Sequence, residues 1–213
     1  MTAGTVAPFL VPAEGARVAP PKSSRVAGVD AARGVALLGM MAAHSLSADD
    51  ANGNPTLAYS LTSGRSAAAF AVLAGVGIAF MTGRARVRPG RDGRAATASL
   101  VVRALAIGAI GLALGYTDTE FAEVILSYYA VLFALAIPLV FAPTVAVAVT
   151  GLGIAVVVPV GSHLLRSGLA EAHGDNPSLS DLLADPLGQL GELAVTGSYP
   201  ALPWMAYLCA PGW

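Results

Sequence analysis

The sequence predicts an all-α membrane protein, a bundle of five full transmembrane helices followed by the start of a sixth. Of its 213 residues, 55% are apolar and only 12% are charged, about half the charged fraction of a typical soluble domain. The apolar residues gather in stretches of roughly the 17–25 residues that a helix needs to cross the hydrocarbon layer. Because the chain has too few polar groups to cover its own core in water, we expect a lipid bilayer to surround it.

Five stretches have this composition and a suitable length. They cover residues 26–46, 66–81, 98–116, 121–141 and 144–165. A sixth begins near Tyr199, and the sequence ends at Trp213. Glycines in or beside these stretches indicate close contact with neighbouring helices; they are Gly64, Gly75, Gly77, Gly151 and Gly153.

Charge predicts the domain organisation and the orientation in the membrane. Residues 1–24 are rich in Ala and Pro without a helical period, which predicts a disordered cytoplasmic tail before a membrane domain at 25–213. Positively charged loops stay in the cytoplasm, and the loop after the second stretch holds Arg84, Arg86, Arg88, Arg91 and Arg94. The segments that alternate with it are acidic, including 167–198. We therefore expect a cytoplasmic N-terminus and an external 167–198 segment, with one or two short amphipathic helices capped by Ser180.

The first stretch carries side chains that lipid should reject. Asp30 and Arg33 are three residues apart, a spacing that allows a structural ion pair on one helical face. His44 follows Arg33 by eleven residues, so it lies on nearly the same face, about 16 Å further along the helix. Ionisable residues inside a span usually face protein or water and mark functional sites. We therefore expect one polar face along this helix, with His44 as a candidate proton acceptor.

The segment RVAGVDAARGVALLGMMAAH at 25–44 resembles the first helix of heparan-α-glucosaminide N-acetyltransferase-like membrane proteins. Its Arg33-x10-His44 spacing is also similar to that of the wider acyltransferase type 3 superfamily. The second stretch, Arg103 and the segment YPALPW at 199–204 fit the same group, so the resemblance covers residues 25–209. In heparan-type enzymes we expect Asn at the position of His44 and a His in the following loop. Residues 45–64 contain no His, which favours the Arg-x10-His branch.

The resemblance implies a membrane acyltransferase of the bacterial envelope. Such an enzyme moves an acyl group, here expected to be acetyl, from acyl-coenzyme A to a carbohydrate or other envelope acceptor. His44 would be the catalytic base or a transient acyl carrier, and Arg33 a catalytic residue that also holds the thioester. Arg91, Arg94 and Arg103 would bind the donor as well, because arginine pairs well with phosphate. The arginine loop is also explained by membrane orientation alone. Acyl-coenzyme A is then a substrate, and no cofactor is expected to stay bound.

Several other functions have little support in the sequence. A single cysteine, Cys209, excludes an internal disulfide, His163 and His173 lack the spacing of metal ligands, and a net charge of −1 gives no reason to expect nucleic acid. Two alternatives to a plasma-membrane enzyme remain. The polar face of the first helix would also suit a transporter that conducts a substrate or proton. The end of the sequence at Trp213, where the resembling proteins have further helices, would also suit a truncated, non-catalytic remnant.

Overall fold

The computed structural model describes residues 27–83, 86–119, 123–165 and 175–212, and in residues 162–165 the backbone alone. The predicted tail at 1–24 and part of the 167–198 segment lie outside these ranges. The described chain is helical apart from its loops and one isolated bridge between Asp49 and Pro55. Its helices are α1 (Ala27–Ser45), α2 (Leu57–Thr62), α3 (Arg65–Met81), α4 (Arg91–Leu114), α5 (Leu126–Leu139), α6 (Thr144–Leu165), α7 (Leu179–Ala184), α8 (Pro186–Gly191), the π-helical η2 (Glu192–Thr196) and α9 (Ala201–Cys209).

Three segments are long and apolar enough to cross a membrane: Leu57–Met81, Arg91–Leu114 and Thr144–Gly161. The helical class and the presence of spanning helices are thereby confirmed, whereas the number of crossings and the orientation stay predictions. Helix α5 is apolar but has only 14 residues. Helix α1 has 19 residues and includes Asp30 and Arg33.

Two boundaries differ from the predicted ones. Helix α4 begins at Arg91, seven residues before the apolar stretch expected at 98, because nothing between Gly90 and that stretch interrupts a helix. Gly90 has a φ of 136°, a conformation that favours glycine and marks the turn before α4. Helix α5 begins at Leu126, later than the expected 121. Hydropathy locates the apolar part of a helix, and the helix itself extends or stops according to local backbone contacts.

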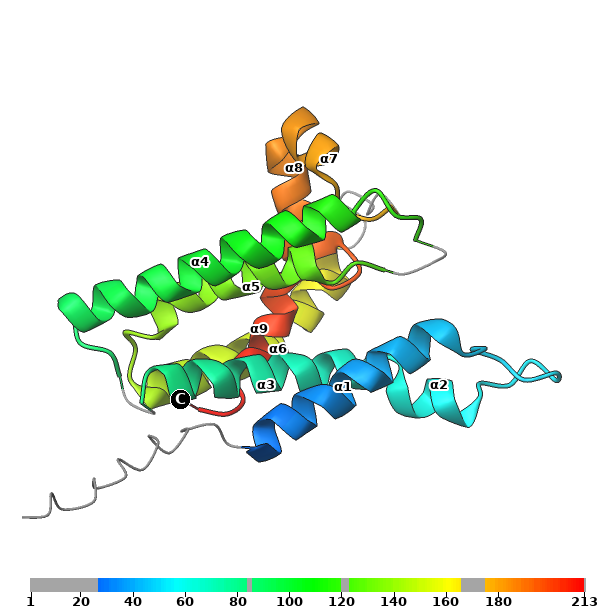
Figure 1. The fold of residues 1–213 in the computed structure, drawn as a ribbon, viewed down its shortest axis with the longest axis horizontal. Coiled ribbons are helices and arrows are strands. Elements are labelled where there is room, and N and C mark those ends of the chain that lie inside the picture. Colours follow the sequence, from blue (N-terminus) through cyan, green and yellow to red (C-terminus); the bar gives the residue numbers. More distant parts are fainter. Residues whose placement is uncertain (1–26, 84–85, 120–122, 166–174, 213) are drawn as a thin grey trace, which may run out of the picture.

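The helices form two layers joined by α9 (Figure 1). One layer contains α1 and α3, the other contains α4 and α5, and α9 packs on α3, α5 and α6 between them. The described residues between α3 and α4 (82–83 and 86–90) lie at one end of the molecule, which we call the arginine end. Residues 46–56 after α1, and 115–119 and 123–125 between α4 and α5, lie at the opposite end, the histidine end. Consecutive long helices therefore run back and forth between the two ends.

Glycines allow α9 to reach this central position. A Cβ atom on Gly75 of α3 would collide with the carbonyl oxygen of Leu208, and one on Gly151 of α6 would lie 2.7 Å from the Cβ of Cys209. The prediction of close helix contact is confirmed for both. It was wrong for Gly64 and Gly153, which have no atom within 4 Å of an added Cβ; Gly64 has a φ of 68° and serves the turn between α2 and α3.

Helices α7 and α8 extend sideways past α4 near the histidine end (Figure 1). The two short helices agree with the prediction, but the cap is Ser178 and the assignment to Ser180 was wrong. The Ser178 hydroxyl accepts a hydrogen bond from the Asp181 N–H, and the Asp181 carboxylate accepts one from the Ser178 N–H at 3.1 Å. This reciprocal capping box satisfies two amides that helix formation leaves unpaired, whereas Ser180 already belongs to the first turn.

Candidate functional site

A cavity of about 370 Å³ opens at the histidine end of α1, within the size range of small-molecule sites. Its walls come from five parts of the chain: the second half of α1, the end of α2, the beginning of α3, the turn before α5 and the residue before Pro200. We call it the His44 cavity. It is lined by Leu37, Met40, Met41, Ala43, His44, Ser45, Thr62, Gly64, Ala67, Phe70, Glu123, Ile125, Leu126 and Tyr199.

Glu123 is the acidic residue of the His44 cavity, and two neighbours fix it. The Ser198 hydroxyl donates a hydrogen bond to Oε1 of Glu123 at 3.4 Å. Tyr199 lies in the turn before α9. Burial raises the pKa of its hydroxyl well above the ordinary range, and the charge of Glu123 and a hydrogen bond with its carboxylate raise that pKa further. The carboxylate and the phenol therefore lie side by side on one wall.

The turn that carries Glu123 is fastened to the segment before α7. Asn176, which is 5% exposed, accepts a hydrogen bond from the Val124 N–H at 2.7 Å and donates one to the Thr117 carbonyl at 3.0 Å. A Cβ on Gly115 would collide with the Pro177 carbonyl, so the two segments touch closely. Residues far apart in the sequence thus hold Glu123 in place, and this contact explains why α5 begins only at Leu126.

Aromatic rings support two sides of the His44 cavity. The Tyr199 ring makes edge-on contacts with Tyr128 and Trp204, at centroid distances of 5.9 and 5.5 Å. On the α3 side, Phe70 makes an edge-on contact with Tyr129 at 5.7 Å. Such pairs limit the movement of both rings, so the cavity offers two fixed apolar surfaces beside its polar groups.

Arg33 lies in a different environment from His44, although both are on α1. Its guanidinium lies 3.5 Å from the Asp30 carboxylate and donates a hydrogen bond to the Leu73 carbonyl of α3 at 3.1 Å. A Cβ on Gly77 would collide with Nη2 of Arg33, so glycine makes room for this contact. The structure thus places Arg33 as a link between α1 and α3, and the residues that line the His44 cavity do not include it.

A second cavity, of about 640 Å³, lies at the arginine end between the end of α3 and the beginning of α4. Arg86 and Arg88 line it together with Asp92 and Ser99. The Ser99 hydroxyl contacts the sulfur of Met81 at 3.2 Å, which joins the two helices across this cavity. We call it the arginine cavity. Two positive side chains against one carboxylate give it an excess of positive charge.

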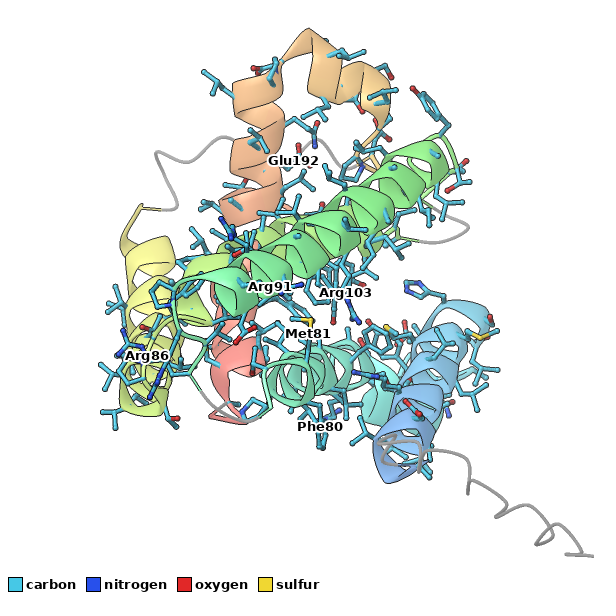
Figure 2. All side chains as sticks on the ribbon, turned by 60° about the vertical axis from the view of Figure 1, so that its left-hand side comes forward. Phe80, Met81, Arg86, Arg91, Arg103 and Glu192 are labelled. Carbon is cyan, nitrogen blue, oxygen red and sulfur yellow. The ribbon has the colours of Figure 1, made fainter. Side chains whose placement is uncertain are left out.

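The three other arginines predicted to bind the donor are spread along α4. Arg91 is exposed in its first turn, and Arg94 lines a separate cavity of about 410 Å³ that also includes Phe141. Arg103 lies one turn beyond Ser99, and Figure 2 shows it on the side of α4 that faces α1 and α3. Arg103 therefore faces the space between the two layers, while Arg94 lies apart from the arginine cavity.

Two residues of the His44 cavity, Glu123 and Tyr199, were not predicted as site residues. Glu123 lies in one of the acidic segments, and Tyr199 opens the sixth apolar stretch and the YPALPW segment of the resemblance. Arg86 and Arg88 belong to the arginine loop, which the sequence explained by phosphate binding or by membrane orientation alone. An acidic side chain directly before an apolar run was the one available signal for Glu123. No group of three or more His, Cys, Asp and Glu suited to a metal ion occurs in the ranges that the structure describes.

A comparison with known protein families matches residues 25–210 to the catalytic domain of heparan-alpha-glucosaminide N-acetyltransferase. Neither the curated proteins nor the solved structures gave a match. The matched segment includes both cavities and nearly every described residue, and the helices long enough to span a bilayer agree with the membrane location of this family. The chain therefore belongs to the heparan-alpha-glucosaminide N-acetyltransferase family, a family of membrane acetyltransferases.

Proposed function

We propose that this chain transfers an acetyl group from acetyl-coenzyme A, bound from the cytoplasm, to a carbohydrate or other acceptor at the outer face of the plasma membrane. The observation that carries the proposal is the position of His44 in a ligand-sized cavity at the end of α1. A histidine within reach of a bound acceptor is suited to general-base catalysis. The cytoplasmic N-terminus expected from the arginine loop puts the His44 cavity outside.

The arginine cavity is the donor end in this proposal. Arg86 and Arg88 supply positive charge for the coenzyme A phosphates, and guanidinium groups pair with phosphate through two parallel hydrogen bonds. Arg103, on the side of α4 facing α1 and α3, gives the donor a third positive contact between the layers. Along α3 the two cavities are lined at Met81 and Ala67, about 21 Å apart at 1.5 Å per residue. A donor with phosphates at one end and a thioester at the other end of a flexible arm suits this separation.

His44 takes a proton from the acceptor hydroxyl or amine as that group attacks the thioester carbonyl. The new bond joins the acceptor atom to the acyl carbon, and the carbon–sulfur bond then breaks. The leaving coenzyme A thiolate takes the proton from the His44 imidazolium, so the products are the acetylated acceptor and free coenzyme A. A transient acetyl-His44 is the alternative route, and it would be trapped as a labelled protein in the absence of acceptor.

Arg33 has a positioning role in this scheme. Its contacts with Asp30 and the Leu73 carbonyl hold α1 against α3, and α1 carries His44. A charge-assisted hydrogen bond to a carbonyl stabilises more than a neutral one. Direct binding of the thioester by Arg33 would require the guanidinium to leave these two partners.

The experiment is acetyl-coenzyme A turnover by the detergent-purified chain, followed as released thiol. His44→Ala should reduce turnover about 10²- to 10⁴-fold, the usual contribution of a general base, with insertion and helix content unchanged. Leu38→Ala is the matched control, because Leu38 also lies on α1 but is 65% exposed and lines neither cavity. Full turnover in the His44 variant would contradict the proposal.

A further inference from the structure

We propose that Glu123 binds the acceptor, as the hydrogen-bond acceptor for a hydroxyl or ammonium group next to the atom that is acetylated. This inference rests on the proposed function, and it adds a residue and a charge preference to the site. It makes the outer cavity selective for neutral or cationic acceptors over anionic ones. Three features of the cavity favour this role: the charge of Glu123, the backbone contacts beside it, and the surfaces around it.

The charge of Glu123 is not neutralised by a cation within the part of the chain that the structure describes. Its neighbours are the Ser198 and Tyr199 hydroxyls, which are uncharged donors. The ion pair between Asp30 and Arg33 does not involve it. A carboxylate has room for about four hydrogen bonds, so Glu123 keeps acceptor sites for a ligand.

His44 and Glu123 line the same cavity from different elements without forming an ion pair. The space of about 370 Å³ therefore separates a candidate proton acceptor on α1 from a fixed carboxylate before α5. A ligand that donates a hydrogen bond to Glu123 has its neighbouring hydroxyl or amine directed towards the His44 side. This arrangement is the one that general-base catalysis needs, because the base must reach the attacking group.

The backbone beside Glu123 is held before any ligand arrives, and its side chain contacts Ser198. Asn176 fastens the Val124 amide, Ser198 contacts the carboxylate, and Tyr199 is held between Tyr128 and Trp204. A Cβ on Gly197 would lie 2.5 Å from the Tyr128 hydroxyl, so the turn that carries Ser198 also packs closely. Preorganised polar groups lose little entropy when a ligand binds.

The remaining surface of the cavity suits a ring with both polar edges and apolar faces. Phe70 and Tyr199 provide aromatic surface, while Ser45 and Thr62 add hydroxyls. Small-molecule sites typically combine such apolar walls with a few fixed polar groups. An acceptor with a carboxylate or sulfate beside its reacting atom would meet the negative charge of Glu123 and bind poorly.

The test compares the full-length chain with Glu123→Gln, using glucosamine, glucose and glucuronic acid as probe acceptors. The glutamine keeps the size of the side chain and removes its charge. We expect the KM for glucosamine to rise about 10- to 100-fold, because the hydrogen bond to a charged group becomes one to a neutral group, with a smaller change in kcat. Wild-type protein should prefer glucosamine and glucose to glucuronic acid, and Glu123→Gln should reduce this preference.

Asp49→Asn is the control, because it removes a negative charge from an exposed loop at the same end of the molecule without touching the cavity. An unchanged KM in Glu123→Gln, with turnover intact, would overturn the role of Glu123 and leave the proposed function standing. The proposed function could also fail while Glu123 still binds the acceptor. Thermal shift with glucosamine, in the absence of acetyl-coenzyme A, detects that outcome. Binding that depends on Glu123 without any acetyl-coenzyme A turnover would support the inference and contradict the proposed function. No glucosamine binding and no turnover with it would contradict the inference.

Discussion

Replacing Gly151 with alanine should loosen the attachment of α9 to α6. The added methyl would lie 2.7 Å from the Cβ of Cys209, an atom that cannot turn away because it is bonded directly to the α9 backbone. Cys209 is 1% exposed, so the surroundings offer no space to accept the shift. The helix itself must move, and α9 follows directly on the Tyr199 wall of the His44 cavity.

Two opposing effects set the change in unfolding free energy of Gly151→Ala. Forcing an extra methyl into a close-packed contact costs about 1–3 kcal/mol. Alanine is also a better helix former than glycine by about 0.5–1 kcal/mol, which hides part of this cost. Gly153→Ala is therefore the reference: Gly153 lies two residues along the same helix and has no atom within 4 Å of an added Cβ. The helix-forming term cancels in the difference, and we expect Gly151→Ala to be less stable than Gly153→Ala by about 1–3 kcal/mol.

Unfolding by SDS titration in mild detergent measures this difference through helix content. The fluorescence of Trp204 gives a second signal from α9 itself. Gly151→Ala should also raise the KM for the acceptor more than Gly153→Ala does, since the Tyr199 wall moves with α9. Equal unfolding free energies for the two variants would refute the close packing of α6 on α9. They would also contradict the position of α9 between the two layers.

Two other changes test the segments around the site. Asn176→Ala should cost about 1–3 kcal/mol of unfolding free energy, because the buried Val124 amide and the Thr117 carbonyl lose their partner. The unfolding free energy and the KM for the acceptor should change together, and a change in neither would contradict the role of Asn176. In Asp50, hydrogen bonds from the Asn54 and Asn52 amides lower the pKa from its ordinary 3.8, so the charged form stabilises the folded loop. The stability advantage of wild type over Asp50→Ala should be complete above about pH 4 and disappear as the pH falls through the lowered pKa, and a difference that does not depend on pH would refute it.

The helical class followed from the sequence because hydropathy reflects the solvent that each segment meets. Three of the predicted spans, 66–81, 98–116 and 144–165, overlap segments that are long and apolar in the structure. Helix ends were harder to predict, since they depend on particular contacts. Asn176 accepts a hydrogen bond from the Val124 amide just before α5, and its position 52 residues along the chain leaves no local signal. The cap of α7 depends only on neighbouring residues, but Ser178 and Ser180 both precede Asp181 and both are residue types that cap helices.

The site was only partly visible for the same reason. Helical spacing placed Arg33 and His44 near one face of α1, and the spacing is correct. What the spacing does not show is which neighbour each residue meets: Arg33 meets the backbone of α3 beside Gly77, and His44 meets a cavity. Glu123 lies 79 residues from His44 in the sequence, so only the packing of α1, α3 and the turn before α5 brings them to one space.

The contacts of Glu123 also determine when the His44 cavity is completed during synthesis. A protein is made from its N-terminus, so α1 and Glu123 are translated before Asn176, Ser198 and Tyr199. Until then the carboxylate has neither its fastening nor its neighbouring hydroxyls. The newborn chain therefore passes through a stage in which His44 has been made but the Tyr199 wall of its cavity is missing, and the cavity is completed only when the turn before α9 has been made.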